Sequence, residues 1–73
     1  MTEKEISIKE EFIRLDALMK LSDTVVTGGH AKVVIQNGEV KVNGEVCTMR
    51  GKKMRDGDFF TYEGTKVTVK KCG

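Results

Sequence analysis

The sequence contains no proline, a single histidine and two cysteines among its 73 residues. A structural zinc site needs about four ligands of the histidine and cysteine kind, so the sequence predicts no metal centre. Cys47 and Cys72 stand apart rather than in a C-x-x-C pair. A disulfide between them is geometrically possible but is not expected in a reducing compartment. We therefore interpret both as free cysteines without a functional role.

Long apolar runs are also missing. No stretch approaches the roughly 20 residues that span a bilayer, and the N-terminus M-T-E-K-E-I-S-I lacks the basic start and apolar core of a signal peptide. These absences predict a cytoplasmic protein with no membrane partner, and we expect a monomer. The hydrophobic (38%) and charged (33%) fractions are typical of one globular domain. We expect that domain to cover residues 1–73, with residues 1–4 as a flexible terminus.

Groups that could catalyse a reaction are scarce. General acid–base catalysis needs titratable side chains held at hydrogen-bond distance in a pocket. The sequence offers one histidine, no pair of carboxylates on one helix face and no nucleophile motif. Asp56 and Asp58 flank a glycine in a predicted turn, where carboxylates commonly accept hydrogen bonds from backbone N–H groups. We expect a protein that is not an enzyme and that binds no cofactor.

The most informative stretch runs from Thr27 to Gly44, TGGHAKVVIQNGEVKVNG. Thr27 is a favourable helix N-cap, and Gly38 suits the position just past a helix end. The apolar face of this helix, spaced i, i+3 and i+4, consists of Ala31, Val34 and Ile35. Asn43-Gly44 is a strong hairpin signal between two short strands.

The remaining pattern predicts an α+β fold, with two short helices packed on a small, mainly antiparallel sheet. The first helix should begin at an Asp16 cap, with Leu15, Leu18 and Leu21 as its apolar stripe. Residues 50–58 form a polar connection without periodicity. The predicted strands cover residues 5–9 (continued by 12–13), 39–42, 45–48, 59–62 and 66–69.

The net charge of +2 is unevenly distributed. Residues 1–13 carry two lysines against four glutamates, whereas residues 50–58 carry four cations against two aspartates. The run RGKKMR at residues 50–55, called the basic loop below, would be solvated surface in most proteins. The distribution permits a polyanionic partner but does not require one.

A candidate anion site lies at the start of the second helix. Helix starts present free N–H groups and a partial positive charge, and glycine allows a phosphate to approach the backbone. Gly28 and Gly29 occupy this position, with His30 and Lys32 as nearby donors. Alternatively, the glycines only allow a tight turn and His30 is incidental. We favour phosphate binding.

These motifs together resemble the S4 RNA-binding domain, also called the αL motif. The matching residues are Arg14-Leu15-Asp16, Thr27, Ala31-Lys32, Ile35, Gly38, Val40, Val42-Asn43-Gly44 and Gly57-Asp58. The small stand-alone bacterial S4-like proteins are similar also at residues 18–21, 27–32 and 50–53. One departure is Gly28, which stands where S4 domains usually have an arginine.

The resemblance implies a non-catalytic protein that binds structured RNA of the ribosomal or transfer RNA class, which could belong to a ribonucleoprotein. In the S4 fold the hairpin side faces the same groove as the two helices, which adds the basic loop and Lys41 to the surface. No aromatic residue interleaves these cations, so recognition of backbone and shape is favoured over base stacking. The candidate RNA-binding residues are Arg14, Lys20, Thr27, Gly28, Gly29, His30, Lys32, Lys41, Arg50, Lys52, Lys53 and Arg55. A protein–protein adaptor that binds an acidic partner, and a DNA-binding protein, remain as alternatives.

Overall fold

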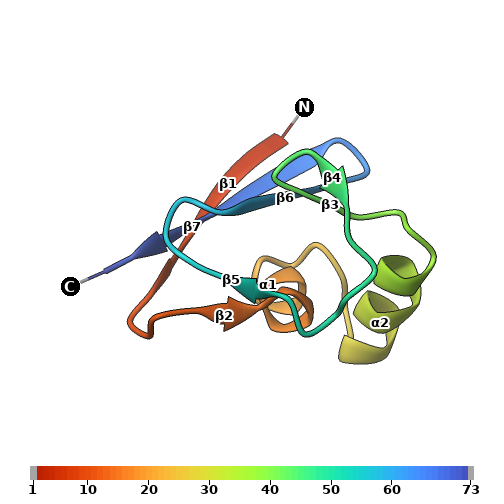
Figure 1. The fold of residues 1–73 in the computed structure, drawn as a ribbon, viewed down its shortest axis with the longest axis horizontal. Helices are drawn as coiled ribbons and strands as arrows, with labels where there is room; N and C mark the ends of the chain where they lie inside the picture. The colour runs from red at the N-terminus through yellow and green to blue at the C-terminus, as the bar shows by residue number, and fades with distance from the viewer. Residues whose placement is uncertain (1, 73) are drawn as a thin grey trace.

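A five-stranded sheet with the strand order β1-β7-β6-β3-β4 forms one layer of the fold (Figure 1). The structure is a computed structural model that describes residues 2–72. Strands β1 and β7 are parallel, and every other neighbouring pair in this sheet is antiparallel. The strands are β1 (Thr2–Ile8), β3 (Lys41–Val42), β4 (Glu45–Val46), β6 (Phe59–Tyr62) and β7 (Thr65–Lys71). The prediction of an α+β fold with a mainly antiparallel sheet is confirmed.

The N-terminal residues belong to this sheet rather than to a flexible terminus. Thr2 pairs with Thr65 at the start of a seven-residue parallel ladder, and the Lys4 ammonium donates a hydrogen bond to the Ser22 carbonyl at 2.9 Å. Our expectation for residues 1–4 was therefore wrong for residues 2–4, while Met1 lies outside the described residues. The physical reason is that the ladder joins the two ends of the chain, and the charged sequence of residues 3–5 carries no local sign of it.

Two helices lie on the same side of the sheet, α1 (Leu15–Leu21) and α2 (Gly28–Gln36) (Figure 1). Helix α2 agrees with its prediction. The hydroxyl of Thr27 accepts a hydrogen bond from the His30 N–H at 3.1 Å, and Gly38 adopts a positive φ of 77° just beyond the helix. Left-handed backbone of this kind is the usual reason for glycine at a helix end.

Helix α1 differs from its prediction in two respects. Its N-cap is Arg14, two residues before the predicted Asp16 cap, and makes no capping hydrogen bond with its side chain, so Asp16 lies within the first turn. The inward-facing positions are therefore Leu15, Leu18 and Met19, all fully buried, whereas Leu21 is 57% exposed. Leu21 was wrongly placed in the core because Met19, not Leu21, lies at i+4 from Leu15.

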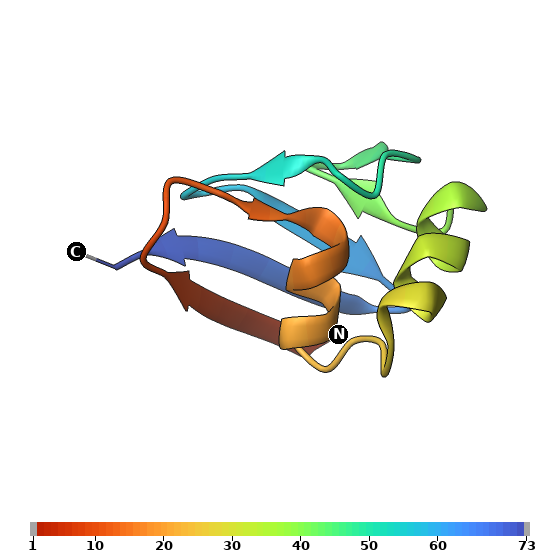
Figure 2. The same cartoon turned by 90° about the horizontal axis from the view of Figure 1, so that it is seen from below.

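A second, two-stranded sheet pairs β2 (Ile13–Arg14) with β5 (Lys53–Met54) (Figure 2). The predicted continuation of the first strand into residues 12–13 was wrong, because the chain bends at residues 9–11 and Ile13 pairs with Met54. The connection over residues 50–58 also contains a strand that we did not predict. Met54 is fully buried, so this connection supplies a core residue.

One hydrophobic cluster fills the space between the sheet and the helices. Its fully buried members include Leu15, Leu18, Met19, Ala31, Ile35, Val40, Met54, Phe60, Val67 and Val69. Both hairpins of the larger sheet turn through two residues with positive φ, Asn43-Gly44 (52° and 88°) and Glu63-Gly64 (47° and 77°). Such turns match the twist of antiparallel strands, as the Asn-Gly pair predicted. None of the helices within residues 2–72 is long and apolar enough to cross a membrane.

Candidate nucleic-acid interface

The basic loop is attached to the start of α1 by its backbone. The carbonyls of Lys52 and Arg50 accept hydrogen bonds from the N–H groups of Leu15 (2.9 Å) and Asp16 (3.1 Å). These contacts occupy first-turn donors that no side chain caps. They also fix the two loop residues beside the helix start, so the side chains of Arg50 and Lys52 project from an anchored backbone.

The pairing of β2 with β5 brings two more cations to the same place. Arg14 lies opposite Lys53 in the antiparallel register. Both side chains are exposed, because the alternate residues Ile13 and Met54 face inward. A Cβ atom at Gly51 would lie 3.9 Å from the Arg14 guanidinium, which shows how closely the loop approaches that side chain. Segments almost 40 residues apart in sequence thus form one cationic cluster.

A shallow groove of about 260 Å³ connects this cluster to the start of α2. Arg14, Asp16, Ala17, Lys20 and Gly28 line it. The Arg14 guanidinium lies 3.3 Å from the Asp16 carboxylate. An ion pair this exposed adds little stability. The lining of the groove therefore combines two cations, Arg14 and Lys20, one carboxylate, Asp16, and the glycine that begins α2.

The start of α2 is open to a ligand. Within residues 2–72 the N–H groups of Gly28 and Gly29 have no hydrogen-bond acceptor. A Cβ atom at Gly28 would meet nothing within 4 Å, and one at Gly29 would meet only the Thr27 hydroxyl, at 3.9 Å. Neither glycine has a positive φ. Packing and backbone geometry do not require glycine here, so the alternative of a glycine-dependent tight turn lacks support.

His30 and Lys32 project from α2 as exposed side chains. In the described part of the chain, neither side chain has an ion-pair or hydrogen-bond partner. The same holds for Lys20, Arg50 and Lys52. Lys20, Lys32, Arg50 and Lys52 can therefore bind an anion without breaking a hydrogen bond or ion pair within residues 2–72.

Two predicted residues lie elsewhere. Lys41 alternates with the buried Val40 and Val42, so it points to the face of the sheet that the helices do not cover. Arg55 begins the turn to β6, where its N–H donates to the Asp58 carboxylate at 2.9 Å. Its charge also helps to lower the pKa of Glu11, although the hydrogen bond and charge of Lys71 contribute more. The structure therefore separates both cations from the helix starts.

The carboxylates of the turn at residues 55–58 are occupied by backbone. Asp58 accepts the Arg55 N–H, and Asp56 accepts the Lys71 N–H, also at 2.9 Å. This confirms the interpretation of Asp56 and Asp58 as turn-stabilising residues.

An aromatic residue, Phe12, lies beside the cationic cluster, which we did not predict from the sequence. We expected no aromatic residue among the candidate RNA-binding cations, but Phe12 is 37% exposed and its ring lies 5.0 Å from the Lys53 ammonium. A lysine in this position over a ring is held by a cation–π interaction. Phe59 is likewise only half-buried, under Lys66 at 4.5 Å. No local signal distinguishes these rings from the buried Phe60.

Comparison with known proteins decides the family. A family model of the S4 domain matches residues 6–70. The chain belongs to the S4 domain family. The resemblance inferred from the motifs is thereby confirmed, and this S4 domain has its second helix and the turn of its hairpin at the residues that those motifs predicted.

Two curated bacterial proteins are similar to this S4 domain. The "Probable ribosome maturation protein RlbA" of Bacillus subtilis is 42% identical over 59 residues, which cover 81% of this chain and 83% of that protein. The "Putative RNA-binding protein YbcJ" of Escherichia coli is 34% identical over 61 residues, which cover 84% of this chain and 87% of that protein.

Proposed function

We propose that this S4 domain is a non-catalytic RNA-binding protein that recognises structured RNA of the ribosomal or transfer RNA class. Its binding surface, called the helix-start surface below, consists of Arg14, Lys20, Gly28, Gly29, Lys32, Arg50, Lys52 and Lys53. The observation that carries the proposal is the attachment of the basic loop to α1 by the carbonyls of Arg50 and Lys52. That attachment holds cations from distant segments beside the groove that ends at α2.

The surface suits phosphate groups. The free N–H groups of Gly28 and Gly29 at a helix start attract an anion. Arginine grips a phosphate with two parallel hydrogen bonds, whereas lysine acts as a mobile point charge. Arg14 and Arg50 therefore fix the orientation of the backbone, and the lysines add attraction that salt screens.

The two relatives support the choice of RNA. One is named as a ribosome maturation protein and the other as an RNA-binding protein. Ribosomal RNA within a ribonucleoprotein is the partner that both names accommodate. We expect a protein with such a partner to act in the cytoplasm.

Binding of a fluorescent RNA stem-loop to single alanine variants tests the proposal. We expect Arg50→Ala and Lys32→Ala each to weaken binding several-fold and to leave the melting temperature nearly unchanged, because neither side chain makes an internal contact. Lys9→Ala is the control, since Lys9 is also an exposed cation but lies at the bend that follows β1, in the acidic segment of residues 1–13. Lys4 would be a poor control because it donates a hydrogen bond to Ser22.

Equal losses for Lys9→Ala and Lys32→Ala would mean diffuse attraction without a site. If the unaltered protein does not bind the RNA stem-loop, RNA binding is rejected and the adaptor alternative is favoured. A DNA stem-loop of the same sequence that competes as well as the RNA would reject recognition of the RNA 2′-hydroxyl and A-form shape.

A further inference from the structure

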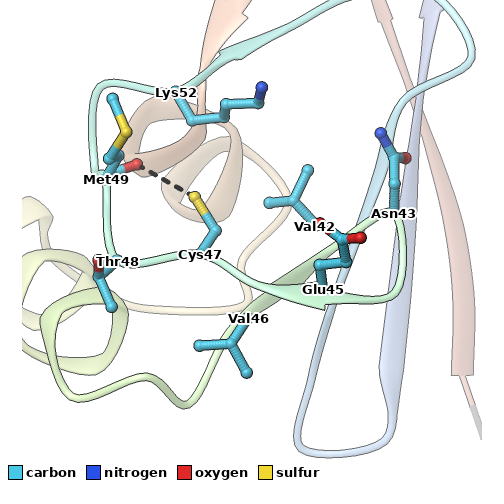
Figure 3. A pocket seen from close by; sticks show the side chains of 8 residues that line it. All are labelled: Val42, Asn43, Glu45, Val46, Cys47, Thr48, Met49 and Lys52. Atoms are coloured by element: carbon cyan, nitrogen blue, oxygen red, sulfur yellow. Dashed lines mark hydrogen bonds between the residues drawn. The ribbon is translucent and has the colours of Figure 1, made fainter.

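A hollow of about 350 Å³ lies between the β3–β4 hairpin and the basic loop (Figure 3). This volume is at the lower end of the range of roughly 300–1,000 Å³ for sites that bind small molecules. The side chains of Val42 and Cys47 point into it, Met49 stands at its edge and Lys52 at its rim, whereas the Val46 side chain points to the other side of the hairpin. Met49 is 67% exposed, so the edge of the hollow offers apolar surface to the solvent.

We propose that this hollow binds one unstacked nucleobase of the RNA, and that the base is guanine. The proposal rests on the proposed function, because it concerns an RNA strand that already lies on the helix-start surface. Lys52 joins the two sites. Its carbonyl accepts the Leu15 N–H at the helix start, while its side chain extends over the hollow. A strand whose phosphate contacts Lys52 therefore passes the opening of the hollow.

The polar groups of the hollow select the kind of base. The Glu45 carboxylate lines the hollow and has no hydrogen-bond or ion-pair partner among residues 2–72. An ionised carboxylate only accepts hydrogen bonds, at two oxygens. It therefore repels a phosphate and favours a base edge with two adjacent donors. Guanine presents such an edge, N1–H beside the N2 amino group, whereas uracil has a single N–H between two carbonyls.

The Asn43 side chain, which also lines the hollow, is not available to recognise the base edge. Its amide donates to the Asp58 carboxylate at 3.2 Å and accepts the Phe59 N–H at 3.1 Å. Both contacts hold the hairpin turn against β6 and keep the wall of the hollow in place. A rigid wall keeps Glu45 and the apolar side chains in position before the base arrives, which limits the entropy cost of binding.

The two cysteines provide the experiment. Cys47 lines the hollow, with its thiol 3.7 Å from the Met49 carbonyl, whereas Cys72 is exposed near the C-terminus. The rate of alkylation of each thiol by iodoacetamide is measured by mass spectrometry, without ligand and with guanosine 5′-monophosphate, uridine 5′-monophosphate or inorganic phosphate. We expect the guanosine nucleotide to slow alkylation of Cys47 several-fold and to leave Cys72 unchanged. The uridine nucleotide and phosphate should have little effect.

An unchanged rate at Cys47 with the guanosine nucleotide would overturn the proposal. Equal protection by inorganic phosphate would also overturn it, because the effect would then be electrostatic.

Two substitutions with matched controls test the residues. Glu45→Gln should abolish the preference for guanosine over uridine, whereas Glu10→Gln, at an exposed bend, should preserve it. Met49→Ala should reduce the protection of Cys47, whereas Val33→Ala should not. Val33 is a suitable control because it is also an exposed apolar side chain, at 54%, but lies on α2 outside the hollow.

Stem-loop RNAs separate this proposal from the proposed function. The two RNAs carry one guanosine or one inosine in an otherwise uridine loop, and inosine lacks only the N2 amino group. Weaker binding of the inosine RNA supports the base site. Equal binding of both RNAs refutes the base site and leaves the helix-start surface intact. Protection of Cys47 by the guanosine nucleotide without binding of either RNA would refute the proposed function instead.

Discussion

Gly28 and Gly29 allow a prediction about stability and a prediction about binding. Replacement by alanine should raise the stability of the fold, whereas a bulkier side chain should weaken RNA binding. Neither residue has a positive φ, and an added Cβ would meet open space at Gly28 and only the Thr27 hydroxyl at Gly29. Replacement of a glycine that the backbone geometry requires destabilises a protein. Here alanine should fit the backbone and restrict the unfolded chain instead.

The expected gain follows from that restriction. Replacing glycine by alanine at a compatible position stabilises a protein by about 0.4–1 kcal/mol. For a domain of this size, that corresponds to a rise in melting temperature of roughly 2–8 °C for Gly28→Ala. Gly44→Ala is the matched control. Gly44 has a φ of 88°, where an L-residue costs roughly 1–2 kcal/mol, so this variant should melt at a lower temperature.

RNA binding should respond in the other direction. The side chain in Gly29→Val lies beside the N–H groups that we propose bind a phosphate, and loss of a hydrogen bond to a charged group costs about 1.5–3 kcal/mol. That cost corresponds to roughly a tenfold to hundredfold weaker affinity for the RNA stem-loop. Circular-dichroism melts and fluorescence anisotropy on the same preparations measure both effects. A Gly29→Val protein with unchanged affinity would refute the anion site, and a destabilised Gly28→Ala protein would refute the open geometry.

Three further predictions follow from other parts of the molecule. Ile35→Ala should cost about 2–5 kcal/mol in denaturant melts because Ile35 is fully buried, and a loss below about 0.5 kcal/mol would contradict the helix assignment. Lys53→Ala should make the slope of log K against log[salt] shallower by about one without changing base preference. An unchanged slope would remove Lys53 from the phosphate contacts. Lys71→Ala should raise the pKa of Glu11 towards its ordinary value, as followed by NMR titration, because Lys71 is the main cause of the lowered pKa. Since that pKa is lowered in the folded protein, the interaction with Lys71 stabilises the fold at neutral pH, and this stabilisation disappears as the pH falls through the pKa of Glu11.

The local parts of the fold were predictable from the sequence. Thr27, the apolar spacing of α2, Gly38 and Asn43-Gly44 each act through neighbours within a few residues, and all four predictions are confirmed. The parallel pairing of β1 with β7 and the pairing of β2 with β5 join residues far apart in the chain. Two-residue strands such as β5 carry no periodicity that a sequence pattern can reveal.

The candidate site was predictable in composition but not in arrangement. The cations were evident, yet their grouping depends on β2, β5 and two carbonyl contacts that leave no trace in residue type. Lys41 is different, because a signal was present. Alternation with Val40 and Val42 predicts that Lys41 faces away from the core and hence away from the helices. The resemblance to S4 domains suggested the opposite face for Lys41, and the alternation was the better guide.

The basic loop divides its two roles between backbone and side chain. Its carbonyls satisfy the first-turn N–H groups of α1, while the side chains of Arg50 and Lys52 stay exposed. Substitution of those side chains can therefore change RNA affinity without removing a stabilising contact. Deletion of Gly51, in contrast, would shift the carbonyls and disturb both α1 and the cation cluster at once. A small domain benefits from this arrangement, because its limited core leaves little stability in reserve for a binding surface that weakens the fold. Lys4 and Lys71, whose ammonium groups are engaged by Ser22 and Glu11, lie away from the helix-start surface, whereas Arg14 combines its place in that surface with an exposed ion pair to Asp16.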